Sequence, residues 1–270
     1  MTDQLNIAIA GAAGRMGRQL VAAAIDAGHS VSGGSEVPGS DFIGKDLGLL
    51  AGRDALGETI KAGIGEAAKG GDVWIDFTTP QATLTALALA PNAGVKAVVI
   101  GTTGFTATQE KEIEKASERI AIVKAGNFSL GVNLLEALVR QAAARLGSDW
   151  DIEVLETHHR RKVDAPSGTA LMLGQAAADG RGQPLEDLRS EPYDGPDAKR
   201  EPGSIGFSVR RSGGVIGDHE VTFGSDMEVV SLSHTALDRA VFAHGAIKAA
   251  EWVLGQKPGL YGMDDLLGLT

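Results

Sequence analysis

A short apolar run that ends in a glycine-rich turn is the feature that most constrains the fold of this chain. Leu5 to Ala10 has the character of a buried strand, and the sequence GAAGRMG follows it from Gly11 to Gly17. From Arg15 to Ala27 the pattern is helical, and Gly28 provides a C-cap. Strand, glycine turn and helix in this order are the setting of a dinucleotide-binding fingerprint. The spacing is G-x-x-G-x-x-G rather than G-x-G-x-x-G, so a plain glycine-rich turn is the alternative interpretation.

A carboxylate after the next strand supports the dinucleotide interpretation. His29 to Ser35 is expected to form this strand, and Glu36 stands at its end. Glu36 lies about 20 residues past the glycines, where an acidic side chain accepts hydrogen bonds from the adenosine ribose hydroxyls. The alternative is an exposed loop carboxylate. Val37 follows and offers no cation to a 2′-phosphate, so the pattern favours NADH over NADPH, although Arg15 could still reach a phosphate.

Strands and helices alternate through the rest of the first half. Three more apolar runs read as strands, and helices are expected between them. The runs are Asp72 to Phe77, Ala97 to Ile100 and Ile120 to Val123. Thr106 and Gln109 form a capping box for the helix that extends to Arg119. This alternation predicts an α/β fold with a Rossmann-like, doubly wound parallel sheet.

Ligands of such sheets bind at the carboxyl ends of the strands. Three loops rich in small or polar residues follow strand ends here, and they are the candidate cofactor-binding segments. Together with Glu36 they comprise Gly11, Ala12, Ala13, Gly14, Arg15, Met16, Gly17, Gly101, Thr102, Thr103, Ala125, Gly126, Asn127 and Phe128.

The pattern changes after residue 128. A long amphipathic helix is expected from Leu130 to Leu146, and later strands at 205–211, 218–224 and 227–234 are closely spaced. Gly213-Gly214 suggests a hairpin-like turn between the first two of these strands. The second half is therefore predicted to be an α+β domain with a mixed, mainly antiparallel sheet. We assign residues 1–128, completed by 239–270, to dinucleotide binding and 129–238 to substrate binding and oligomerisation.

The segment ETHHRRKVDAPSGTA, from Glu156 to Ala170, is the densest group of cations and proton-transfer side chains in the chain. It contains His158, His159 and Lys162, and it lies between an expected strand and an expected helix that begins at Gly168. Cations beside a helix N-terminus suggest a carboxylate or phosphate ligand, and histidine with lysine suggests proton transfer. A solvated basic loop is the alternative.

Composition excludes several classes of function. The chain has 270 residues and no cysteine, which rules out disulfides, thiolate metal sites and a cysteine nucleophile. The net charge is −10, which argues against nucleic acid as the main partner. No apolar run is long enough to span a bilayer and no signal peptide is visible, so we expect a cytoplasmic protein without a membrane partner. No spacing of His, Asp and Glu predicts a metal site.

Several motifs together resemble the family of 4-hydroxy-tetrahydrodipicolinate reductases, formerly called dihydrodipicolinate reductases. The chain carries them in the family's order: GAAGRMGR at 11–18, DFTTP at 76–80, GTTGF at 101–105, NFSLGVN at 127–133, EVLETHHRRKVDAPSGTA at 153–170 and GGVIGDHEVTFG at 213–224. They span nearly the whole chain, and the long histidine-containing motif is highly specific.

The resemblance implies the activity and the roles of the site residues. The reaction would be NADH- or NADPH-dependent reduction of 4-hydroxy-tetrahydrodipicolinate with loss of water, in lysine and diaminopimelate biosynthesis. Lys162 would be the main proton donor, and His158 a proton donor or acceptor at the substrate. His159, Gly168 and Thr169 would bind this small cyclic dicarboxylate. Some family members have Arg where this chain has Val37, which again favours NADH. Family members are usually homotetramers, and we expect the same here.

Two alternatives remain at this stage. One is another oxidoreductase, although the Tyr–Lys pair of short-chain dehydrogenases is absent, since Asp197 and Asp265 stand four residues after the two tyrosines. The other is a non-catalytic nucleotide sensor, which would not need His158 and Lys162 together. We interpret His219, His234 and His244 as structural residues, and Arg160 and Arg161 as surface or supporting groups.

Overall fold

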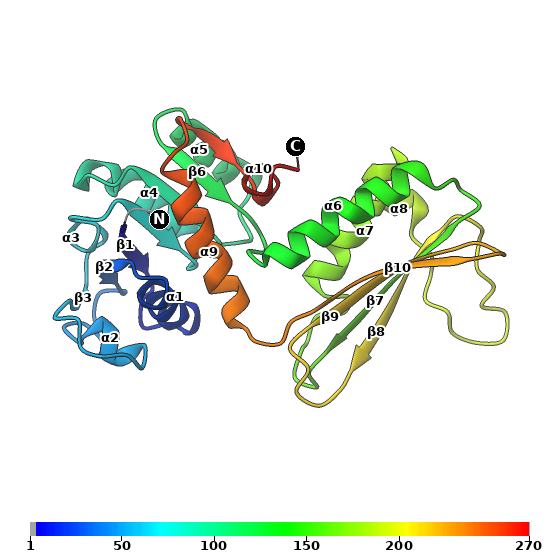
Figure 1. The fold of residues 1–270 in the computed structure, drawn as a ribbon, viewed down its shortest axis with the longest axis horizontal. Coiled ribbons are helices and arrows are strands. Elements are labelled where there is room, and N and C mark those ends of the chain that lie inside the picture. The colour runs from blue at the N-terminus through cyan, green and yellow to red at the C-terminus, as the bar shows by residue number, and fades with distance from the viewer. Residues whose placement is uncertain (1–3, 270) are drawn as a thin grey trace. The chain divides into compact units, whose positions relative to one another are not determined.

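The computed structural model describes residues 4–269, which form two compact units. The first unit comprises the chain up to Ser129 together with the segment from Ala240 onward, and the second comprises Leu130–Arg239. Each unit has its own sheet and its own apolar core (Figure 1). We describe the two units separately.

The sheet of the first unit is parallel, with the strand order β11-β6-β5-β4-β1-β2-β3. Its strands are β1 Asn6–Ala10, β2 Ser30–Ser35, β3 Ile60–Lys61, β4 Val73–Asp76, β5 Ala97–Ile100, β6 Ala121–Lys124 and β11 Gly259–Tyr261. The chain passes from β1 outward to β3 and then returns to β4 on the other side of β1. This reversal places a topological switch point between β1 and β4, where such sheets bind ligands. The predicted Rossmann-like sheet is confirmed.

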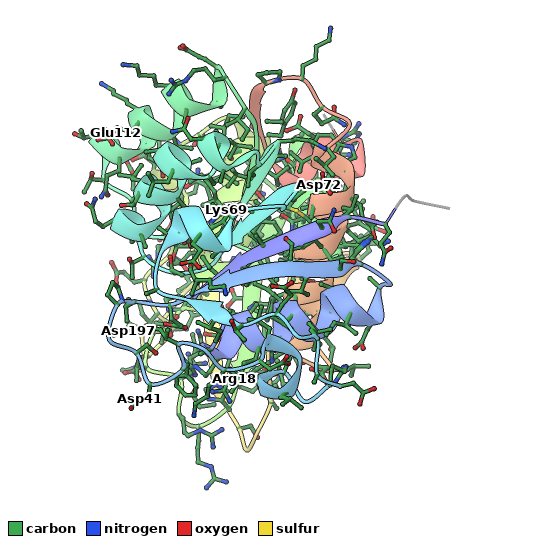
Figure 2. The ribbon with its side chains drawn as sticks, turned by 90° about the vertical axis from the view of Figure 1, so that its left-hand side faces the viewer. Arg18, Asp41, Lys69, Asp72, Glu112 and Asp197 are labelled. Carbon is green, nitrogen blue, oxygen red and sulfur yellow. The ribbon has the colours of Figure 1, made fainter. Side chains whose placement is uncertain are left out.

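Helices cover both faces of this sheet because its strands are apolar on both sides (Figure 2). Ile7, Ile9 and Ile75 face one core, which contains α1 (Arg15–Asp26) and α9 (Ala240–Val253). Ala8 and Trp74 face the other core, which contains α3 (Ile64–Ala67), α4 (Pro80–Leu89) and α5 (Ala107–Ser117). The predicted capping box of Thr106 and Gln109 is present at the start of α5.

The amino ends of the strands are tied together by polar side chains, away from the glycine turn. Asp72, labelled in Figure 2, precedes β4 and accepts hydrogen bonds from Asn6 at the start of β1. It also forms an ion pair with Lys96, which precedes β5, at 2.7 Å. The candidate cofactor loops lie at the opposite edge of the sheet, at the carboxyl ends of the strands.

The second unit contains a four-stranded mixed sheet in the order β10-β9-β7-β8 among its described residues. Its strands are β7 Asp151–His158, β8 Ile205–Arg211, β9 Asp218–Gly224 and β10 Val229–Thr235. Helices α6 (Leu130–Arg145) and α7 (Gly168–Arg181) pack together on one face, and Ile152, Val154 and Phe223 point into the core between sheet and helices. The short helix α8 spans Leu185–Leu188. The predicted mixed sheet is confirmed.

The expected hairpin at Gly213-Gly214 is wrong. Strand β8 does not pair with β9, because β7 lies between them, parallel to β8 and antiparallel to β9. Strand β7 buries Ile152 and Val154 completely, and a central strand of this kind needs a partner on each side. The antiparallel hairpin is formed by β9 and β10 instead.

Several short elements had no sequence prediction. Residues 38–71 contain α2 (Leu47–Leu50), β3 and α3, none longer than four residues. The 3-10 turn at Pro91–Ala93 follows α4, and α10 (Met263–Leu267) follows β11. Met263 at the start of α10 is buried.

Candidate active site

The glycine turn brings α1 close to the end of β1. Gly11 has φ +58°, a conformation that L side chains rarely adopt, and its carbonyl accepts a hydrogen bond from the N–H of Gly14 at 2.9 Å. A Cβ atom on Gly17 would lie 2.1 Å from the carbonyl oxygen of Gly11. The first glycine therefore makes the turn and the last permits the close contact of helix and strand, as a dinucleotide site requires.

Glu36 is fixed against this turn. Its Oε1 atom accepts a hydrogen bond from the backbone N–H of Ala13 at 3.1 Å, and Oε2 lies 3.3 Å from the N–H of Val37. Arg18, which Figure 2 labels on α1, donates from Nε to the carbonyl of Ala13 at 2.8 Å. The side chain of Val37 is 68% exposed. The Glu36 carboxylate therefore lies against the glycine turn, and the next residue, Val37, is uncharged.

A cavity of about 360 Å³ opens at the carboxyl ends of β1, β2 and β4. Gly11 and Glu36 line it from the glycine turn and the end of β2, while Thr78, Thr79 and Thr85 line it from α4 and its approach. A cavity with a glycine turn, a helix start and an acidic side chain at its rim fits the adenosine part of a dinucleotide. The residues present therefore fit a nicotinamide dinucleotide.

The other candidate cofactor residues lie on loops after the strand ends, with different exposures. Ala12, Gly17, Thr102 and Phe128 are buried, while Gly14, Arg15, Thr103 and Gly126 are exposed; Met16, Gly101, Ala125 and Asn127 are intermediate. The ring of Phe128 packs against that of Phe77, with centroids 5.2 Å apart. The Phe128 side chain thus belongs to the core, and its loop can offer a ligand only backbone atoms at this position.

Asp76 is a site residue that the sequence reasoning did not single out. It is buried at the end of β4, borders the cavity, and accepts hydrogen bonds from the N–H and hydroxyl of Thr78 at 3.0 and 2.5 Å. The Thr102 hydroxyl lies 3.3 Å from it. Burial raises the pKa of the Asp76 carboxyl, and the hydrogen bonds from Thr78 oppose that rise. Asp76 therefore connects the loops that follow β4 and β5.

In the second unit, the first group of the histidine-containing motif lies on the strand rather than on the loop. Strand β7 continues to His158, whose Nδ1 atom is 2.6 Å from Oε2 of Glu156. Glu156 is completely buried and forms a two-pronged ion pair with Arg211 of β8, at 2.7 and 2.9 Å. Burial alone would raise the Glu156 pKa, but the hydrogen bonds from Arg211 and His158 lower it overall.

The loop after β7 carries the other cations. The Nζ atom of Lys162 lies 2.8 Å from Oδ2 of Asp164, and this ion pair holds the pKa of Asp164 below its usual range. His159 is half-buried, and its Nδ1 atom is buried without a hydrogen-bond partner. Burial first, and the nearby charges of Arg161 and Arg239 second, lower the pKa of His159. Arg160 and Arg161 themselves are exposed.

Helix α7 begins next to this loop. The side chain of Ser167 caps it by accepting a hydrogen bond from the N–H of Ala170 at 3.1 Å. Gly168 is exposed, and a Cβ atom there would meet nothing within 4 Å. The start of α7 thus presents backbone N–H groups at Gly168 and Thr169, where a helix favours an anion.

His219, which we interpreted from the sequence as a structural residue, also lies in this cluster. Its ring stands edge-on to that of His158, with centroids 5.1 Å apart, and its Nε2 atom is 3.0 Å from the hydroxyl of Ser167. Burial first, and the charge of His158 second, lower the pKa of His219 to about 4. The motif contains both His158 and Glu156. The contacts of these residues with Arg211 and His219 depend on the strand register, because Arg211 and His219 are far from the motif in the chain.

Among residues 4–269 no group of three or more His, Cys, Asp or Glu residues could hold a metal ion. Over the same residues, none of the helices has the length and the apolar character needed to cross a membrane.

A parallel Rossmann-type sheet with a glycine turn and a carboxylate at the end of β2, and a cluster of histidines and cations in the second unit, are typical of a nicotinamide dinucleotide-dependent oxidoreductase. Two family models extend this conclusion. "Dihydrodipicolinate reductase, N-terminus" matches residues 5–128, and "Dihydrodipicolinate reductase, C-terminus" matches residues 131–267. The chain therefore belongs to the dihydrodipicolinate reductase family.

Individual relatives agree over the full length. A 4-hydroxy-tetrahydrodipicolinate reductase from Parvibaculum lavamentivorans is 51% identical over 100% of both chains. A dipicolinate-bound dihydrodipicolinate reductase from Paenisporosarcina sp. TG-14 has a similar structure, with a TM-score of 0.75, 25% identity, and coverage of 97% of this chain and 99% of that one. An amine dehydrogenase from Mycobacterium smegmatis shares the fold at 15% identity, with a TM-score of 0.66 and coverage of 97% and 96%.

Proposed function

We propose that this protein is a 4-hydroxy-tetrahydrodipicolinate reductase, which uses NADH or NADPH to reduce its substrate with loss of water in lysine and diaminopimelate biosynthesis. The relatives that match over the full length carry this name. The single observation that carries the proposal is the cluster at the end of β7. There a histidine bonded to a buried carboxylate, a lysine and a helix start occur within twelve residues, from His158 to Thr169.

The substrate has two carboxylates on a small ring, and this cluster provides cations and N–H donors that can bind them. The N–H groups of Gly168 and Thr169 at the start of α7 would hold one carboxylate. His159 has a buried Nδ1 atom without a hydrogen-bond partner, which a bound substrate can satisfy. Lys162 adds a positive charge next to these groups. The assignment of all these roles rests on the family resemblance together with the placement of the residues.

The chemistry requires one hydride and one proton for each water released. The reduced nicotinamide supplies the hydride when it is bound. In our mechanism the substrate would lose water from C4, and the conjugated imine that remains would take up the hydride of the bound cofactor and a proton on the ring. Lys162 is the proton donor, and its neighbour Asp164 holds the ammonium in place at 2.8 Å. His158 exchanges a proton at the substrate, with its ring oriented by Glu156.

The candidate cofactor residues favour NADH. Glu36 accepts a hydrogen bond from the N–H of Ala13. At this position its carboxylate could also accept hydrogen bonds from the ribose hydroxyls, and its negative charge would repel a 2′-phosphate. Arg18, the neighbouring cation, already donates to the carbonyl of Ala13 and lies over the ring of Phe42, 5.2 Å from its centroid. The uncharged Val37 adds no cation. NADPH remains a usable cofactor in this proposal, with lower efficiency.

The first experiment measures the loss of reduced-nicotinamide absorbance. The substrate is generated by condensation of pyruvate with aspartate semialdehyde, and NADH and NADPH are compared. The proposal expects substrate-dependent oxidation of both, faster with NADH. If the nucleotide binds and no substrate-dependent oxidation occurs, the chain is the non-catalytic nucleotide sensor. Activity only with other imino acids would assign it to a different reductase.

Replacement of Lys162 tests the assignment of the proton donor. Lys162→Met keeps the length of the side chain and removes the ammonium, so kcat should fall by about 10²–10⁴-fold. The dissociation constant for NADH, measured by fluorescence titration, should change less than twofold. The matched control is Lys69→Met, which removes an exposed ammonium from the first unit and should leave kcat unchanged (Figure 2). Equal turnover in Lys162→Met and the wild type would reject the role.

A homotetramer in the cytoplasm completes the proposal. One row across the sheet of the second unit, Ser208, Leu155, Glu220 and Ser233, alternates with residues of the core and therefore faces away from α6 and α7. Near it Met227 and Val229 of the β9–β10 hairpin are 92% and 64% exposed. Sedimentation equilibrium should give four times the mass of one chain, and Val229→Lys should lower this mass. A monomer in the wild type would contradict this part of the proposal.

A further inference from the structure

Glu156 is the buried charge that the proposed mechanism uses least. Its side chain has no solvent exposure, and it lies on the central strand β7 two residues before His158. A buried carboxylate is costly unless its charge and its lone pairs are matched. The contacts of Glu156 therefore indicate what its burial achieves.

Four donors fill the carboxylate of Glu156. Oε2 receives Nδ1 of His158 at 2.6 Å and one guanidinium nitrogen of Arg211 at 2.7 Å. Oε1 receives the other guanidinium nitrogen at 2.9 Å and the backbone N–H of Ser167 at 3.0 Å. An ionised carboxylate has about four lone-pair sites and no proton to donate. All four lone-pair sites of the Glu156 carboxylate are occupied, and each partner must donate a hydrogen.

This pattern fixes the proton on one nitrogen of His158. Because Glu156 can only accept, the Nδ1 atom of His158 must carry a hydrogen whether the ring is neutral or charged. Proton exchange with a substrate then takes place at Nε2. The space at this atom is kept open by Gly217, since a Cβ atom there would lie 3.0 Å from Nε2. The absence of a side chain at Gly217 therefore keeps Nε2 accessible, while the Glu156 carboxylate binds Nδ1.

We infer that Glu156 is a positioning residue for the reductase reaction: with Arg211 as its counter-ion, it holds His158 as the Nδ1-protonated tautomer with Nε2 free for the substrate. The inference rests on the proposed function. Through the N–H of Ser167 the same carboxylate fixes the residue that caps α7, so one side chain sets both the proton-transfer group and the start of the helix that would bind the substrate carboxylate.

The other charges around His158 do not replace Glu156. His219 of β9 stands edge-on to His158, and its burial keeps it neutral near pH 7. Lys162 and Asp164 on the loop after β7 form an ion pair with each other at 2.8 Å. Arg211 of β8 is bonded to Glu156 and to the carbonyl of Asp164. Among the contacts of the described residues, Glu156 alone provides the acceptor for Nδ1 of His158.

A double-mutant cycle separates positioning from a merely structural role. His158→Gln should lower kcat by about 10²–10⁴-fold, and Glu156→Gln by about 10²-fold. If Glu156 acts through His158, the double variant should have a kcat within about twofold of His158→Gln alone. If the two losses multiply instead, the positioning role is overturned. Glutamine keeps one oxygen that can accept the N–H of Ser167, so any change in the KM for the substrate on Glu156→Gln should be the same in both backgrounds.

A second measurement needs neither the activity nor a variant at Glu156. In wild-type protein labelled with ¹⁵N at histidine, the two ring nitrogens of His158 report separately on protonation, and the signals are assigned by their loss in His158→Gln. At a pH where the ring is neutral, the hydrogen should be found on Nδ1. A hydrogen on Nε2 would overturn the inference, even if Glu156→Gln did not fold.

The outcomes also separate this inference from the proposed function. Absence of substrate-dependent NADH oxidation by the wild type would reject the proposed activity, whatever the tautomer of His158. Activity in the wild type, together with multiplied losses or with an Nε2-protonated ring, would reject the positioning role alone.

Discussion

The charge of Glu156 is buried in the second unit and is matched by several donors, whereas the ion pair on the loop after β7 is partly exposed. Glu156 is bonded to Arg211 and His158, and Lys162 to Asp164. Removal of one partner of a buried pair leaves an unmatched charge, which costs about 3–5 kcal/mol, more than the pair itself contributes. Substitutions that keep shape, such as Gln for Glu, are therefore more informative at this site than truncation to Ala.

The proposed preference for NADH can be tested at the exposed position next to Glu36. Val37→Arg would place a guanidinium where a 2′-phosphate is expected, and 68% exposure of the native side chain leaves room for it. We expect the ratio of kcat/KM for NADPH to that for NADH to rise about tenfold, which corresponds to ~1.4 kcal/mol. Steady-state kinetics with both nucleotides measure this ratio.

The control for this change is Val37→Gln, which has a polar side chain of similar length without charge. It should leave the ratio within twofold of the wild type. An equal rise in both variants would show that charge is not the cause, and an unchanged ratio in Val37→Arg would place the 2′-phosphate away from residue 37.

At the level of single residues, the sequence revealed groups that are close together in the chain. His158, His159 and Lys162 stand within five positions, and the glycines within seven, so composition alone drew attention to them. Arg211 is separated from Glu156 by 55 positions, and only the parallel register of β7 and β8 brings the two together. Asp76 was hidden for a different reason, because a carboxylate at the end of an apolar run does not reveal its burial.

At the level of elements, long periodic segments were predicted well and short ones were not. The expected strands at 205–211 and 218–224 coincide with β8 and β9. The four-residue helices α2 and α3 contain too few turns to show a period. The order of β7, α7 and β8 is itself a strand–helix–strand unit, which favours parallel pairing through a crossover. The glycine pair after β8 gave a local hairpin signal, and this longer-range preference outweighed it.

At the level of the whole molecule, the candidate cofactor residues lie on the parallel sheet and the candidate proton-transfer residues on the mixed sheet. Parallel strands covered on both faces direct their loops to one edge. The glycine turn and Glu36 follow strands that end at this edge, and Asp76 is the last residue of another. The mixed sheet of the second unit is covered by α6 and α7 on one face, and its central strand delivers Glu156 and His158 to the start of α7. The pattern of apolar residues predicted both architectures, because burial on two faces or on one face leaves a different period in the sequence.

Burial of His219 should make the stability of the folded chain depend on pH. Its pKa is about 4 in the folded protein against 6.5 for a free histidine. Between these values the unfolded chain binds a proton that the folded chain does not, so stability is lost as pH falls from about 6.5 toward 4. The loss between pH 7.5 and pH 5 should be ~2 kcal/mol, or a fall of about 4–8 °C in Tm from this group. Scanning calorimetry of His219→Gln should show a Tm less dependent on pH by this amount, because glutamine does not titrate.

The control is replacement of the exposed His244 by Gln, which should keep the wild-type dependence of Tm on pH. If His219→Gln retains the full pH dependence, other groups cause it and His219 is already protonated in the folded state.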